Sequence, residues 1–139
     1  MCRNEYFHVE FPQDVILACK SDINALKLLG LTIAIKLWAP GLKGANIQVF
    51  CDNSSAVTVL NSGSTKSTFL NDCLRELWFY AAKFELFITA VHLPGVDNHL
   101  PDLLSRWDKG DNKNTFLSLF EHGVEININN NLFYFENDL

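Results

Sequence analysis

The sequence lacks several features that would assign it to a class at first sight. Its four cysteines form no C-x-x-C pair and have no histidine at the spacing of a metal finger, so we expect free, buried thiols in a reducing compartment. A Gly-rich phosphate-binding loop is also missing, and this absence counts against a small-molecule α/β enzyme of the flavodoxin type.

Long apolar runs are missing as well. Gly30, Thr32 and Lys36 interrupt the apolar stretch over residues 28–38, and the N-terminus has no apolar signal region. These absences predict an intracellular protein that makes no membrane contact. They do not distinguish the cytoplasm from the nucleus.

Basic residues are too few for strong, autonomous binding of nucleic acid. The formal net charge is −5, and residues 1–110 contain ten Lys and Arg against eleven Asp and Glu. Residues 111–139 contain one Lys against five acids, so the acidity is concentrated in the tail. A domain that binds phosphates by itself is expected to be basic.

The remaining composition is that of one globular domain. The chain has 139 residues, of which 48% are hydrophobic, enough for a single core. Composition and pattern divide it into an N-terminal segment with one strand (residues 1–21), a central domain (residues 22–109) and an acidic, Asn-rich tail (residues 110–139).

The first elements are a strand and a helix. Alternation of apolar and polar residues predicts a strand over residues 6–11, which Pro12 ends. A helix follows over residues 22–38, with Ser21 or Asp22 as its cap. At 100° per residue, Lys36 falls on the polar arc of this helix and Lys27 on the opposite, inner side.

The central residues predict a β-α-β crossover. A strand over residues 46–52 ends at Asp52, helices follow over residues 55–61 and 66–83, and a nearly continuous apolar strand over residues 85–92 completes the unit. Such a strand suits a parallel sheet that is covered on both faces. The fold class is therefore α/β, a parallel strand pair with flanking helices.

A last helix of the central domain is expected over residues 100–107, with Asn98 as its cap. In the tail, residues 115–121 suit one further helical turn. The triple Asn at residues 129–131 either turns a hairpin or belongs to a loose segment.

Two carboxylates, Asp52 and Asp102, are the candidates for chemistry. The crossover returns the second strand beside the first, and the last helix then begins near the carboxyl end of the pair, where ligands of open α/β sheets usually bind. Each also has a structural explanation. Asp52 begins a strand-to-helix turn, and Asp102 lies in a first helical turn, where it complements the helix dipole.

A series of short motifs, in this order and spacing, resembles the ribonuclease H domain of retrotransposon polyproteins. It is most similar to the DIRS-type elements that carry a tyrosine recombinase, and it covers roughly residues 22–108. The motifs are Ile23-Asn24-Ala25-Leu26-Lys27-Leu28-Leu29, Lys36-Leu37-Trp38, Val49-Phe50-Cys51-Asp52-Asn53, Val59-Leu60-Asn61-Ser62-Gly63, Leu74-Arg75-Glu76-Leu77-Trp78, His92-Leu93-Pro94-Gly95 and Asp102-Leu103-Leu104-Ser105-Arg106-Trp107.

The resemblance implies a metal-dependent nuclease site. In that family four acidic side chains hold two Mg²⁺ or Mn²⁺ ions that clamp a phosphate of an RNA–DNA hybrid. Two of those acids match Asp52 and Asp102, which would be the remaining catalytic and metal-binding residues. By position, Asn53, Ser54 and Asn98 would contact the nucleic-acid backbone, although all three equally suit helix caps.

Two departures from the family decide the expected function. The family usually has Leu-Glu-Leu where this chain has Leu26-Lys27-Leu28, so Lys27 stands at the position of the third acid. The fourth acid has no counterpart, because the chain matches the family only from about its third strand. We therefore expect a partial ribonuclease H-like fold that lacks the first strands, an N-terminally truncated element.

We expect Lys27 to form an ion pair with Asp52 or Asp102 and to compete with Mg²⁺. The alternative is that its ammonium extends to solvent past Trp38. With the pair formed, the domain binds no metal stably and does not hydrolyse a hybrid by itself. Whether it is an enzyme at all is therefore left open.

Two histidines and one strand edge suggest further roles. His92 and His99 suit a general base, but both lie at polar ends of elements. A binding module is the alternative function: it would use the retained fold to hold an RNA–DNA hybrid, another nucleic acid or a protein. The strand edge left by the missing strand predicts self-association, unless residues 6–11 or 126–135 fill the gap.

Overall fold

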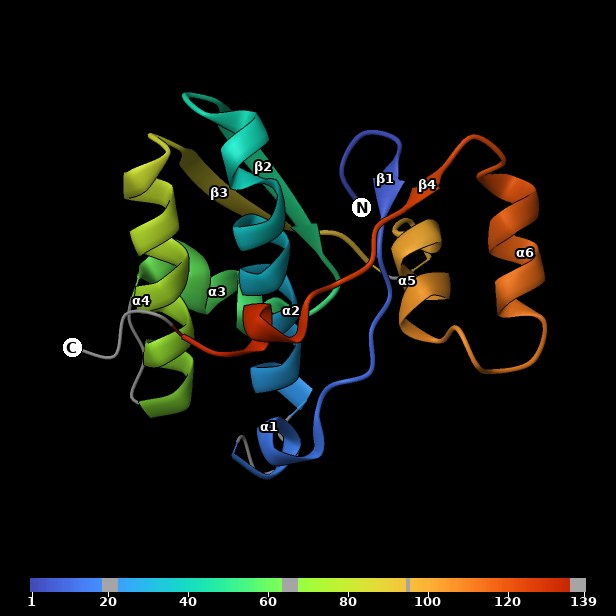
Figure 1. The fold of residues 1–139 in the computed structure, drawn as a ribbon, viewed down its shortest axis with the longest axis horizontal. Helices are drawn as coiled ribbons and strands as arrows, with labels where there is room; N and C mark the ends of the chain where they lie inside the picture. The colour runs from blue at the N-terminus through green and yellow to red at the C-terminus, as the bar shows by residue number, and fades with distance from the viewer. Residues whose placement is uncertain (19–22, 64–67, 95, 136–139) are drawn as a thin grey trace.

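The computed structural model describes residues 1–18, 23–63, 68–94 and 96–135 and shows an α/β protein (Figure 1). Its regular elements, in chain order, are β1 (Glu5–Tyr6), α1 (Gln13–Ala18), α2 (Ile23–Trp38), η1 (Ala39–Leu42), β2 (Asn46–Cys51), α3 (Ser54–Ser62), α4 (Thr68–Lys83), β3 (Phe87–His92), α5 (His99–Ser105), α6 (Asn112–Leu119), β4 (Val124–Glu125) and η2 (Asn130–Phe133).

The predicted crossover is confirmed. Strands β2 and β3 pair in parallel, with Asn46 opposite Phe87 and Cys51 opposite His92. Helices α3 and α4 connect them, and α4 lies beside α2 (Figure 1). The predicted and observed bounds of these elements differ by a few residues at most, and the expected caps Ser21 and Asp22 lie outside the described residues.

The strand pair is covered on one face, so the expectation that β3 is covered on both is wrong. Ile88 and Ala90 are buried against the helices, whereas Phe87 is 71% exposed. On β2, Phe50 is 50% exposed and belongs to the same outer face, because parallel register aligns it with Val91. The apolar run of β3 therefore includes side chains that the fold leaves in water.

The outer edges of the two strands differ. On β3, the side-chain amide of Asn61 donates to the carbonyl of Ala90 (2.8 Å) and accepts from its N–H (2.9 Å). This side chain from α3 thus takes the hydrogen-bonding place of a neighbouring strand. Within the described residues, β2 pairs only with β3.

The predicted strand over residues 6–11 is mostly wrong. Only Glu5–Tyr6 is a strand, and it pairs in parallel with Val124–Glu125 of the tail. The alternation has a different cause: Phe7 packs on Trp38 and Phe11 on Phe133, each as a separate contact with the main core. The N-terminal segment and the tail pair with each other, and in the parts of them that the structure describes neither adds a strand beside β2.

Two hydrophobic clusters stabilise the fold. The larger lies between the strand pair and helices α2, α3 and α4, and includes Leu28, Leu77 and Ile88. The smaller joins Tyr6 of β1 to Leu104 of α5 and Phe116 of α6. The tail contributes to both clusters, because η2 supplies Phe133 to the larger one, so residues 126–133 form neither a hairpin nor a loose segment.

A buried ion pair connects α2, α4 and the tail. The ammonium of Lys36 lies 2.9 Å from Glu76 Oε1, and both side chains are 1% exposed. The same Nζ donates to the carbonyls of Tyr134 (3.0 Å) and Leu132 (3.3 Å). All three N–H donors of the lysine therefore have acceptors, which a buried ammonium requires.

This pair corrects the predicted orientation of α2. The sequence placed Lys36 on the polar arc of the helix and Lys27 on its inner side. In the structure Lys36 is buried with Thr32 on the side of the helix that packs in the core, whereas the Lys27 side chain is 31% exposed. Hydrophobic residues surround nearly the whole helix, so their periodicity alone did not indicate the buried side.

The segment Ile23–Leu42 has 20 residues and a mean hydropathy of 1.4. By length and composition alone, it could span a membrane. The expectation that no stretch approaches that length is therefore wrong. A core helix passes the same test, and α2 makes the contacts of a core helix: Leu28, Ile33 and Lys36 are buried inside the protein.

Replacing Lys36 with methionine is expected to lower the free energy of unfolding by about 3–5 kcal/mol, because the Glu76 carboxylate stays buried without its ammonium. The double variant Lys36→Met, Glu76→Leu should recover most of this loss. Urea unfolding measures both. Lys27→Met is the control and should cost less than about 1 kcal/mol, since that lysine is partly exposed. Equal losses for the two lysine variants would contradict this account of the core.

Candidate nucleic-acid and metal site around Asp52

Asp52 lies immediately after β2, between a buried residue and a helix N-terminus. Cys51 precedes it, and α3 begins at Ser54. Burial raises the pKa of the Cys51 thiol, and the neighbouring Asp52 carboxylate raises it further, whereas the N–H of Asn53 and the Lys27 charge act in the opposite direction. Cys51 is therefore a protonated, buried thiol rather than a nucleophile.

The predicted ion pair of Lys27 is confirmed. Its Nζ lies 3.6 Å from Oδ1 of Asp52, within ion-pair distance. The two side chains are 31% and 27% exposed, so the pair lies at the surface of the site and is partly screened by water.

The position of Lys27 follows from that of Lys36. The two residues are nine apart on one helix, which is about 900°, or two and a half turns, and they therefore point in opposite directions. Because Lys36 points toward Glu76 of α4, Lys27 points away from α4 and reaches the carboxyl end of β2. The buried pair thus orients the exposed one.

Asn53 has a structural role in the described contacts. Its Oδ1 accepts from the N–H of Ala56 (2.8 Å) and caps α3, and its Nδ2 donates to Asn24 Oδ1 of α2 (2.8 Å). Ser54 is the exposed first residue of α3. Asn98 occupies the cap position of α5, as expected, but its side chain makes no capping hydrogen bond.

Asp102 lies in the first turn of α5, as predicted, and it also pairs with a cation. Its Oδ1 is 3.4 Å from Nε of Arg106, four residues further on at the C-cap of the helix. The Asp102 side chain is 25% exposed. His92 and His99 lie at the end of β3 and the start of α5, the polar boundaries that the sequence indicated.

The residues present do not fit the two-metal centre that the resemblance implies. Each of the two candidate acids already has a cationic partner, Lys27 for Asp52 and Arg106 for Asp102. Two divalent ions about 4 Å apart need several carboxylates around them. Within the described ranges, no group of three or more His, Cys, Asp or Glu side chains is placed to hold a metal ion.

Sequence reasoning missed the side-chain contacts that fix the site in place. The hydrogen bond between Asn24 and Asn53 and the amide of Asn61 on β3 had no local signal. The pair of Lys36 and Glu76 had a weak local signal. Thr32 and Lys36 are one turn apart on the same side of α2 as the buried Leu29, which indicates that Lys36 is buried too. Of the expected buried thiols, Cys51 and Cys73 are buried, Cys2 is half-buried, and Cys19 lies outside the described residues.

Comparison with known proteins adds no relative. No protein-family model matches the chain, and no curated protein or solved structure shows significant similarity to it.

Proposed function

We propose that this chain is a ribonuclease H-like domain of retrotransposon origin that does not hydrolyse nucleic acid by itself. One observation carries the proposal: the Lys27 ammonium lies 3.6 Å from Asp52, where the resembling family has a glutamate. A fixed positive charge there replaces both a metal ligand and the metal's own charge.

The arrangement of the elements supports the likeness of fold. Helix α2, which carries Lys27, packs beside the parallel pair of β2 and β3. Asp52 follows β2, and α5, which carries Asp102, follows β3. The ordered motifs in the sequence support the same likeness. The pairing of both acids with cations supports the loss of activity.

Purified protein is expected to leave an RNA–DNA hybrid intact in the presence of Mg²⁺ or Mn²⁺, because two acids that already pair with cations cannot hold two metal ions. Cleavage of an end-labelled hybrid on a denaturing gel is the measurement, with an active ribonuclease H as the positive control. Metal-dependent cleavage by the wild-type chain that Asp52→Asn abolishes, and that Asp72→Asn leaves unchanged, would overturn the proposal.

A second candidate, a module that self-associates, rests on the outer edge of β2. The bonds from Phe87 N to Ala45 O and from Leu93 N to Cys51 O direct the odd-numbered residues of β2 toward β3. The N–H and C=O groups of Asn46, Gln48 and Phe50 therefore point outward. No hydrogen bond among the described residues accounts for these outward groups.

The outer edge of β2 lacks the features that usually prevent a strand edge from pairing with another chain. Residues Asn46–Cys51 include no charge and no proline, the two features that usually protect a strand edge. A second copy related by a two-fold axis would place Gln48 opposite its own copy, in an antiparallel pair with no like charges opposed. The excess of acidic residues favours such a protein partner over nucleic acid.

Replacing Gln48 with proline tests this candidate, because proline removes an N–H that points away from β3 and leaves the parallel ladder intact. Light scattering coupled to size exclusion should show concentration-dependent dimers for the wild type and monomers for Gln48→Pro. The control Gln48→Ala keeps the N–H and should still dimerise. A monomeric wild type, or dimers of Gln48→Pro, would refute self-association through this edge.

A further inference from the structure

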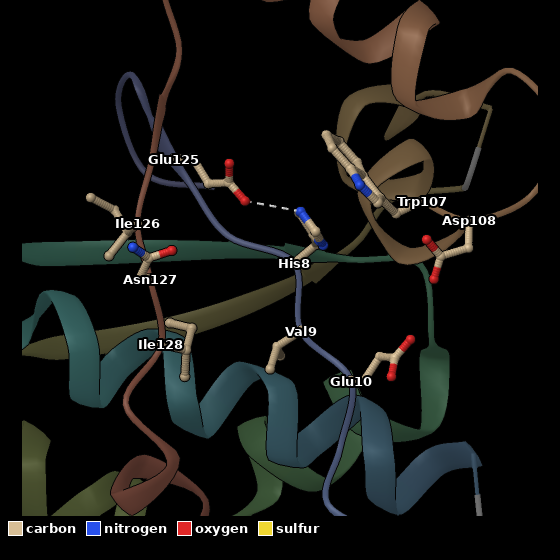
Figure 2. Close-up of a pocket in the computed structure, with 9 residues that line it drawn as sticks. All are labelled: His8, Val9, Glu10, Trp107, Asp108, Glu125, Ile126, Asn127 and Ile128. Atoms are coloured by element: carbon tan, nitrogen blue, oxygen red, sulfur yellow. Dashed lines mark ion pairs between the residues drawn. The ribbon is translucent and has the colours of Figure 1, made fainter.

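His8 lies where three separate parts of the chain meet. It belongs to the N-terminal segment, its Nε2 is 3.0 Å from Oε1 of Glu125 in the tail, and its ring stacks on Trp107 after α5 (Figure 2). The ring centroids of His8 and Trp107 are 4.1 Å apart and the planes are inclined by 17°. One imidazole thus contacts both the tail and the smaller hydrophobic cluster.

The backbone contact next to His8 is too short to be stable alone. Strands β1 and β4 have two residues each, and the N–H groups of Val124 and Ile126 donate to the carbonyls of Asn4 (2.7 Å) and Tyr6 (2.8 Å). An isolated two-stranded ladder of this length needs side-chain contacts to persist in water. The contacts of His8 are placed just beyond its end.

The charged residues that line the cavity beside His8 are all acidic. The imidazole lines a cavity of about 420 Å³ with Glu10 of its own segment, Glu125 of the tail and Asp108 after α5. The other lining residues are Val9, Trp107, Ile126, Asn127 and Ile128, so no lysine or arginine faces it there (Figure 2). Its side chain is 26% exposed, so protons exchange with the solvent.

Protonation therefore strengthens both contacts of the ring. An imidazolium forms a charge-assisted pair with the Glu125 carboxylate, and it gains a cation–π attraction to the Trp107 indole. The neutral ring keeps at most one weaker hydrogen bond and the stacking. Histidine is the side chain that commonly changes charge between about pH 5 and 8.

We propose that His8 is a pH-sensitive latch that holds the N-terminal segment and β4 against Trp107, immediately after α5. With the proton bound, the latch is closed and the β1–β4 ladder is protected. Loss of the proton as the pH rises weakens the latch, and the two segments open more often.

Amide hydrogen exchange on the full chain tests the latch. The protection of the Val124 and Ile126 amides, corrected for intrinsic exchange, should fall about two- to five-fold between about pH 5 and pH 8, the range expected for a partly exposed ion pair. His8→Phe keeps an aromatic ring on Trp107 without a charge, and its protection should not change with pH.

Two further variants keep the test decisive. Glu125→Gln removes the partner charge with little change in size and should also abolish the pH dependence, which serves if His8→Phe folds poorly. His92→Gln changes an exposed histidine at the end of β3, in the other strand pair, and should keep the pH dependence. Protection that is independent of pH in the wild type, or a full pH dependence in His8→Phe or Glu125→Gln, would overturn the latch.

Discussion

The buried pair of Lys36 and Glu76 is the constraint on which the rest of the structure depends. A lysine ammonium taken out of water needs a counter-charge and acceptors for all of its N–H groups. Glu76 of α4 supplies the charge, and the carbonyls of Leu132 and Tyr134 supply the remaining acceptors. The requirement therefore joins α2 to α4 and brings the acidic, Asn-rich tail into the core.

The same constraint reaches the candidate site through the geometry of one helix. With Lys36 held toward α4, the rotation of α2 is fixed, and Lys27 is carried to the carboxyl end of β2. There it pairs with Asp52. Under the proposed likeness to ribonuclease H, this puts a positive charge where the resembling family has an acid. The buried pair thus fixes the rotation of α2, and with it the position of the Lys27 charge beside Asp52.

Local pattern predicted the elements that have their own period, and failed where distant contacts decide. The β-α-β unit and the extent of α2 were predictable, because helical stripes, strand composition and turn residues lie within a few positions of each other. The pair of Lys27 with Asp52 was expected from the resemblance, which places Lys27 where the family has an acid. The exposure of the outer face of β3 was not predictable, because an apolar run does not show which face of the strand is left uncovered. Nor were α1, the short β1–β4 ladder or the place of Lys36, because each depends on residues far away along the chain.

Lys27 is proposed to exclude metal from the site at Asp52, and a calorimetric titration with Mn²⁺ tests this most directly. The account predicts that the wild-type chain shows no binding that depends on Asp52 up to millimolar metal, and that Lys27→Glu acquires such binding, which Asp52→Asn then removes. Saturable Mn²⁺ binding by the wild type that is lost in Asp52→Asn would contradict it.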